Sequence, residues 1–102
     1  ERRVRDFVDA RFADEISLSD LAEIAGLSRF HFARQFKATF GTTPHQYLMD
    51  KRIEAARAML HRAGLSMAEI AQKSGFRSDT NFSRAFRSQT GVSPSVYRKS
   101  AM

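Results

Sequence analysis

Two arginines, Arg34 and Arg84, lie fifty residues apart in the same local pattern, Phe-x-Arg-x-Phe. In a helix this spacing places both phenylalanines on one face and the arginine on the opposite face. A guanidinium group on an outer helix face can donate two hydrogen bonds to O6 and N7 of guanine, or it can bind a phosphate group. The repeated arrangement therefore favours recognition of nucleic acid.

Other outward-facing residues of these two helices extend the candidate surface. Phe30 lies in a first helical turn beside two bases, where its ring can contact a thymine methyl group; packing against the central helix is the alternative. Asp79 favours the start of its own helix, and it can also accept a hydrogen bond from cytosine N4. The candidates for base contacts are Arg29, Phe30, Ala33, Arg34, Asp79, Thr80, Ser83 and Arg84. The candidates for phosphate contacts are Ser28, Lys37, Arg77, Ser78 and Arg87.

Positive charge is concentrated in the part of the chain that carries these residues. The net charge of the sequence is +6 at pH 7. Residues 1–23 contain seven acids and four bases, whereas residues 24–102 contain four acids and thirteen bases. Such a field favours nucleic acid or an anionic membrane surface as a partner, although a merely soluble basic surface has the same composition.

Catalytic, metal-binding and membrane-spanning functions find no support in the sequence. His31, His45 and His61 lack metal-ligand spacing, and there is no glycine-rich phosphate loop or nucleophile elbow. The lack of cysteine excludes disulfides and thiolate metal sites. No apolar run approaches the ~18 residues of a membrane span, and no signal peptide opens the sequence. We therefore expect no enzyme activity, cofactor, metal ion or membrane partner, and a cytoplasmic location.

The candidate surface belongs to an internal repeat, in which residues 17–47 recur as residues 66–97. Each copy contains a short helix, a turn with a glycine and a second helix, which together form the helix-turn-helix signature. Because two copies are too few for a solenoid, we interpret the repeat as a duplicated binding module. The shared landmarks are Phe32, Arg34, Phe36, Gly41, Pro44 and Tyr47 in the first copy and Phe82, Arg84, Phe86, Gly91, Pro94 and Tyr97 in the second.

Periodicity and capping residues predict an all-α fold. The expected helices are residues 3–12, 17–25, 29–40, 44–63, 67–74 and 79–90, followed by a short last helix from residue 94. Serine N-caps are expected at Ser17, Ser28, Ser66 and Ser78. The residues expected to face the core include Leu18, Phe32, Phe36, Ala63, Phe82, Phe86 and Val96. The chain beyond Lys99 is expected to fray.

The helix 44–63 is expected to join two lobes, residues 1–43 and 64–102. At 1.5 Å per residue it would be about 30 Å long. This length is close to the ~34 Å between successive major-groove entries on one face of B-DNA. One chain would then carry two readers with different outer residues, so we expect an asymmetric DNA site instead of a palindrome.

The landmarks resemble those of the DNA-binding domain of the AraC/XylS family of bacterial transcription regulators. The strongest match is IAQKSGFRSDTNFSRAFRSQTGVSPSVYR, residues 70–98. The first copy matches through LAEIAGLSRFHFARQFKATFG and the central helix through KRIEAARAML. The resemblance covers nearly the whole chain and implies about seven helices. It also implies recognition helices at 29–40 and 79–90.

The same resemblance implies a function and partners. Family members bind double-stranded DNA and regulate transcription, with RNA polymerase as an implied partner. They often carry a separate effector-binding or dimerisation domain, usually N-terminal, and we expect such a domain outside this sequence. A small-molecule effector would act only through it. The alternative is a helical adaptor that binds proteins through its basic surface, and a steep loss of duplex binding with salt would separate the two hypotheses.

Overall fold

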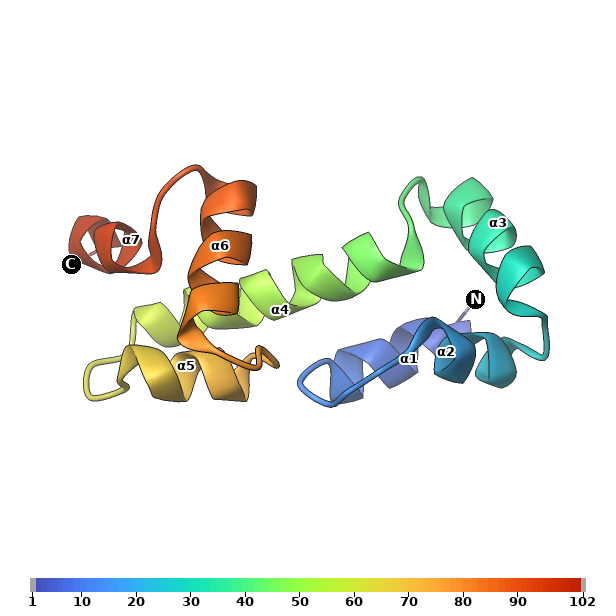
Figure 1. Cartoon of the computed structure of the whole chain (residues 1–102), viewed down its shortest axis with the longest axis horizontal. Coiled ribbons are helices and arrows are strands. Elements are labelled where there is room, and N and C mark those ends of the chain that lie inside the picture. The colour runs from blue at the N-terminus through green and yellow to red at the C-terminus, as the bar shows by residue number, and fades with distance from the viewer. Residues whose placement is uncertain (1, 102) are drawn as a thin grey trace. The chain divides into compact units, whose positions relative to one another are not determined.

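The computed structural model describes residues 2–101, in which all regular structure is helical (Figure 1). The helices are α1 (Arg2–Arg11), α2 (Leu18–Ala25), α3 (Arg29–Phe40), α4 (Pro44–Leu60), α5 (Met67–Lys73), α6 (Asp79–Thr90) and α7 (Pro94–Ala101). The all-α fold with seven helices is thus confirmed. The chain forms two compact units, and the boundary between them lies within α4, after Lys51.

Serine caps define where the first helix of each repeat begins. The backbone N–H of Asp20 donates to Ser17 Oγ at 3.0 Å, and the backbone N–H of Ser17 donates back to Asp20 Oδ2 at 3.0 Å. Ser66 and Glu69 exchange the same two bonds at 3.1 and 3.0 Å. Each pair satisfies two backbone donors that have no partner inside the helix, so the helix start is fixed locally.

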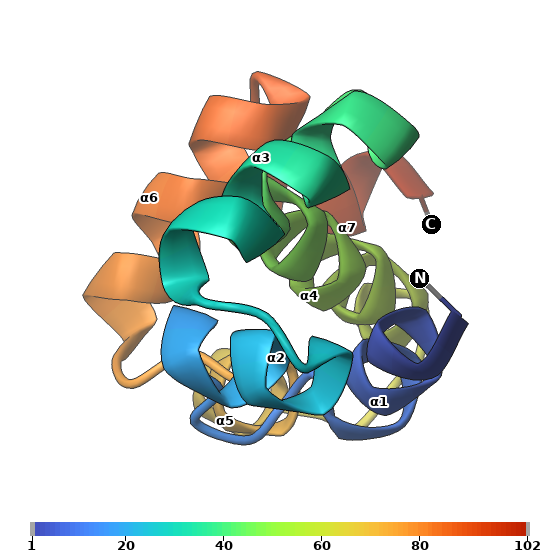
Figure 2. The ribbon, with the colours of Figure 1, turned by 90° about the vertical axis from the view of Figure 1, so that its right-hand side faces the viewer.

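The first unit is built around α2, which packs against both α1 and α3. Figure 2, in which this unit faces the viewer, shows α1 and α2 with α3 crossing above them. The buried residues that form its core are Val4, Val8, Leu21, Ala22, Phe32, Phe36 and Leu48. The Phe36 ring contacts the rings of Phe32 and Tyr47, with centroids 5.7 and 5.5 Å apart. Aromatic packing therefore fixes α3 against the start of α4.

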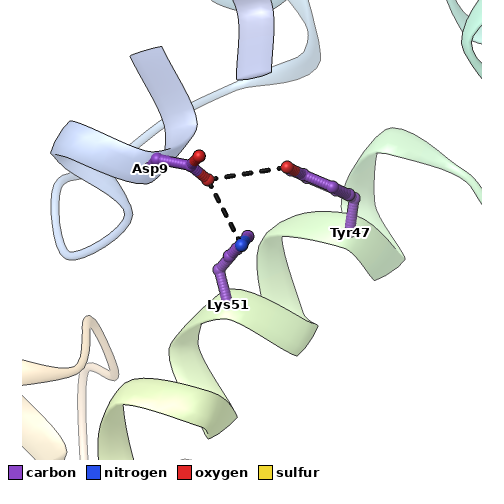
Figure 3. A network of polar contacts seen from close by, with 3 residues as sticks. All are labelled: Asp9, Tyr47 and Lys51. Carbon is purple, nitrogen blue, oxygen red and sulfur yellow. Dashed lines mark hydrogen bonds and ion pairs between the residues drawn. The ribbon is translucent and has the colours of Figure 1, made fainter. Parts of the chain in front are cut away.

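A polar network joins α1 to the same end of α4 (Figure 3). The Tyr47 hydroxyl donates to Asp9 Oδ1 at 3.5 Å, and Lys51 Nζ lies 3.4 Å from the same oxygen. Burial of the hydroxyl and the nearby negative charge of Asp9 raise the pKa of Tyr47. The network holds α1 beside the start of α4. Because all three groups are partly exposed to solvent, it adds little to the stability of the unit.

In the second unit, α6 packs against both α5 and α7. The buried apolar residues of this unit are Ile53, Ala56, Leu60, Ile70, Ala71, Phe76, Phe82 and Phe86. The Phe86 ring contacts Phe82 and Tyr97, with centroids 5.7 and 5.4 Å apart. Arg98 Nε donates to the carbonyl oxygen of Leu60 at 3.1 Å, which satisfies a last-turn acceptor of α4 and ties α7 to it.

The central helix ends earlier than the sequence predicts. It stops at Leu60 instead of Ala63, because the N–H of Arg62 donates to the Met59 carbonyl and starts a turn. The φ angle of +92° at Gly64 completes the reversal. Ala63 is consequently exposed, so its expected place in the core is wrong. With 17 residues, α4 is about 26 Å long.

Four other expectations at helix edges are corrected. Leu18 is 39% exposed at the first position of α2, and Val96 is 49% exposed on α7, so neither lies in the core. The helix α5 ends at Lys73, one residue early. The expected fraying is wrong for Ser100 and Ala101, because α7 continues to Ala101; Met102 lies outside the described residues. The bond from Arg98 to α4 holds that last turn.

Truncation of Phe86 or Phe36 to alanine is expected to destabilise the unit that contains it by about 3–5 kcal/mol. Both rings are almost completely buried; Phe36 contacts three other aromatic rings and Phe86 contacts two. Urea unfolding followed by circular dichroism measures the loss. The exposed Phe30→Ala is the control and should change stability by less than about 0.5 kcal/mol. An unchanged melting temperature in Phe36→Ala or Phe86→Ala would contradict the inward orientation of these helices.

Acid is expected to weaken the second unit partly through Glu69. The hydrogen bond from the Ser66 backbone N–H holds the pKa of the Glu69 carboxyl below its usual range. The unfolded chain therefore takes up this proton at higher pH than the folded chain does. The stabilisation is complete above pH ~4.3 and is lost as the pH falls through the folded pKa. In urea titrations at several pH values, Glu69→Gln should flatten this dependence; equal slopes for both proteins would contradict it.

Candidate nucleic-acid interface

The outer face of α3 carries most of the residues that the sequence selects in the first repeat. Because Phe32 and Phe36 are buried, the opposite face of the helix points to solvent. The exposed candidates there are Arg29, Phe30, Arg34 and Lys37. Ala33 differs from them: it is half-buried and lines a hollow of about 230 Å³ beside the start of α4. It lies at the flank of the face instead of its centre.

Phe30 is the most exposed large apolar residue of the described chain, at 65%. At this exposure little of the side chain is covered, which disfavours close packing against the central helix, the alternative for this residue. Its ring faces two polar neighbours, the imidazole of His31 and the guanidinium of Arg34. Its position is therefore available to a ligand that approaches the first turn of α3.

The N-terminus of α3 is capped by Ser28, as the sequence predicts. Ser28 Oγ accepts a hydrogen bond from the backbone N–H of His31 at 3.2 Å, and it also lies 2.9 Å from His31 Nδ1. His31 was not among the candidate residues, although its place three residues after the cap was visible in the sequence. The first-turn amides and the cap hydroxyl form a small donor group that suits a phosphate oxygen.

In α6, as in α3, one face is buried and the opposite face is exposed, but the exposed residues differ. Phe82 and Phe86 are buried, and the exposed candidates are Asp79, Thr80, Ser83, Arg84 and Arg87. Ser78 caps this helix by accepting from the Asn81 backbone N–H at 3.1 Å. Arg77 is exposed in the turn just before the cap. Asp79 lies in the first helical turn, where a carboxylate stabilises the N-terminus.

The charge on these two faces suits an anionic partner. The helix α3 carries three bases and no acid, and α6 carries two bases and one acid. Among residues 2–101, no group of three or more His, Cys, Asp or Glu side chains is placed to hold a metal ion. No helix in that range is long and apolar enough to cross a membrane. The arrangement provides hydrogen-bond donors and positive charge on two exposed helices.

Comparisons with known proteins agree with this geometry. A family of helix-turn-helix domains matches residues 21–100. The transcriptional activator NphR of Rhodococcus is 42% identical over 98 residues, which are 95% of this chain and 29% of NphR. Among solved structures, the DNA-binding domain of AdpA in complex with a target DNA has a TM-score of 0.92 at 31% identity, covering 97% of this chain and 89% of that one.

A second solved structure, an AraC-type regulator from Chromobacterium violaceum, has a TM-score of 0.87 at 28% identity and covers 98% of this chain and 89% of that one. The fold and the two exposed helix faces define a helix-turn-helix DNA-binding domain. The chain belongs to the AraC family of transcription regulators. It spans between 13% and 38% of the length of the curated relatives that it matches.

Proposed function

We propose that this chain binds double-stranded DNA at a specific sequence by inserting α3 and α6 into successive major-groove segments, and that it thereby regulates bacterial transcription. The observation that carries the proposal is the same in both units. The second helix of each helix-turn-helix buries two phenylalanines and exposes an arginine from the opposite face. A helix of this kind fits the width of the major groove.

The exposed residues divide into base readers and phosphate binders. Arg34 and Arg84 are suited to donate two hydrogen bonds to guanine, and Phe30 is suited to contact a thymine methyl group. Short side chains near the start of α6, Thr80 and Ser83, reach base edges when the helix lies deep in the groove. The proposed phosphate contacts are Ser28, Lys37, Arg77, Ser78 and Arg87.

The wider role concerns a protein that is longer than this chain. The relative NphR is named an activator, and activation through contact with RNA polymerase is the corresponding role for the whole protein. An effector ligand would act through another part of that protein and not through the two units described here. The site of action is the bacterial DNA in the cytoplasm.

Salt dependence distinguishes DNA binding from a protein-adaptor role. A domain that neutralises several phosphates loses duplex affinity steeply as salt rises, because counterions are released on binding. Titration of a duplex library between 50 and 200 mM salt, an interval of about fourfold, should weaken binding by about a thousandfold or more for six or more phosphate contacts. Salt-independent or absent duplex binding would favour the adaptor.

Substitution of either outer-face arginine by alanine is expected to weaken binding to a selected site by about 1–3 kcal/mol if it reads a base. Both side chains are exposed and outside the apolar core, so the fold should survive. Affinity for the selected duplex and helical circular dichroism are measured for Arg34→Ala and Arg84→Ala. The solvent-facing Arg57→Ala on α4 is a matched control. Unchanged affinity in either variant would remove that arginine from the interface.

The DNA site of a single chain is expected to be asymmetric. The two recognition helices expose different residues, and their order along the chain is fixed. Two-fold dimers of identical units select palindromes, whereas unlike readers in one chain select a directional site. Selection from a random duplex library, a footprint and the mass of the complex test this. A palindrome that needs two copies of the chain would contradict it, as would protection of only one groove segment.

A further inference from the structure

The two arginines proposed to read bases differ in their surroundings. The guanidinium carbon of Arg34 lies 5.4 Å from the centre of the Phe30 ring, one helical turn earlier. The edge-on imidazole of His31 lies against the same ring, with centroids 5.9 Å apart. His31 Nδ1 lies 2.9 Å from the Oγ of the capping residue Ser28. A series of contacts therefore leads from the fixed helix start to the Arg34 guanidinium.

The second repeat has no such series. The positions of Phe30 and His31 are occupied there by Thr80 and Asn81, neither of which has an aromatic ring. Within residues 2–101, Arg84 makes no hydrogen bond, ion pair or aromatic contact. The side chain of Arg84 therefore keeps a rotational freedom in the unbound protein that the Phe30 ring restricts in Arg34.

When the rotation of an arginine side chain is restricted before binding, both its affinity for DNA and its discrimination between bases change. A guanidinium stacks favourably on an aromatic face, and its planar fork then points in a defined direction. A side chain that is already held loses less freedom on binding. A defined direction also rejects base pairs whose acceptors lie elsewhere, whereas a mobile arginine can turn to a neighbouring base or to a phosphate.

We propose that Phe30 is a positioning residue that aims Arg34 at one base pair, so that α3 discriminates more strictly at its arginine-read base than α6 does at the base read by Arg84. The inference rests on the proposed DNA-binding function. Beyond that function, it predicts that the half of the DNA site bound by α3 tolerates fewer base changes than the half bound by α6.

The first test uses the unbound protein. Nitrogen-15 relaxation at the arginine Nε atoms should show a more ordered Arg34 than Arg84 in the wild type. Phe30→Thr, which places the residue of the second repeat in the first, should make Arg34 as mobile as Arg84. Phe30→Tyr should keep the order, because it retains the ring. Equal mobility of the two arginines in the wild type would overturn the inference.

The second test is a double-substitution cycle on a duplex chosen from a random library. The base pair read by each arginine is the one at which Arg34→Ala or Arg84→Ala removes discrimination. Phe30→Thr should reduce discrimination at the Arg34 base pair by about two- to fivefold, the range of one exposed cation–π contact. At that base pair it should have no further effect when Arg34 is already alanine. In reverse, Thr80→Phe should raise discrimination at the Arg84 base pair by a similar factor.

The controls separate positioning from direct contact. An equal loss at the Arg34 base pair from Phe30→Thr with and without Arg34 would mean that the ring acts there independently of the arginine, which overturns the inference. The proposed contact of Phe30 with a thymine methyl group would appear at a different base pair, and replacing thymines of the site by deoxyuridine would identify it. Circular dichroism and melting temperature should be unchanged, because both substituted positions are exposed. Equal wild-type affinity for all duplexes would refute the proposed function and the inference together. A selected site without coupling would refute the inference alone.

Discussion

Burial of two phenylalanines, one turn apart, on the inner side of α3 and of α6 is the constraint on which the proposed DNA-binding surface depends. A helix presents only one apolar stripe, so the placement of Phe32 and Phe36 inside determines that Arg34 lies outside. Rotation of α3 to reverse this would expose two rings and bury an unpaired guanidinium, which is strongly unfavourable. The arginine is therefore oriented by the packing of its neighbours and needs no contact of its own to face the solvent.

Features that depend on local chemistry could be predicted from the sequence. A serine cap followed three residues later by an acid determines the starts of α2 and α5, and the bounds of α3 and α6 agree with those expected. The features that were missed depend on tertiary neighbours. The periodicity of Leu18 and Val96 suits a core, but neighbouring elements leave 39% and 49% of these residues exposed. The last turn of α7 follows a bond from Arg98 to another helix.

The candidate site also contains features that the sequence predicts and features that it does not. Exposure of the two arginines followed from the helical period, because the phenylalanines on the opposite face are buried. The partial burial of Ala33 could not be predicted from the helical period, because it depends on where α4 begins. The contacts of Phe30 with His31 and Arg34 depend on side-chain rotamers, which the residue pattern does not specify. The sequence thus predicts which residues face outward, and only the structure shows which of them touch one another.

The division of α4 between two units has a consequence for cooperativity. The first turns of this helix belong to one core and the last turns to the other, with the boundary after Lys51. Starting a helix is unfavourable and extending it is not, and a helix shorter than about 12 residues is marginal in water. One nucleation event therefore serves both cores, since whichever unit orders its half provides a template for the other. Loss of either unit would leave fewer than three turns of α4 without a core, and these would fray back towards Lys51. The shared helix therefore couples the stability of the two units.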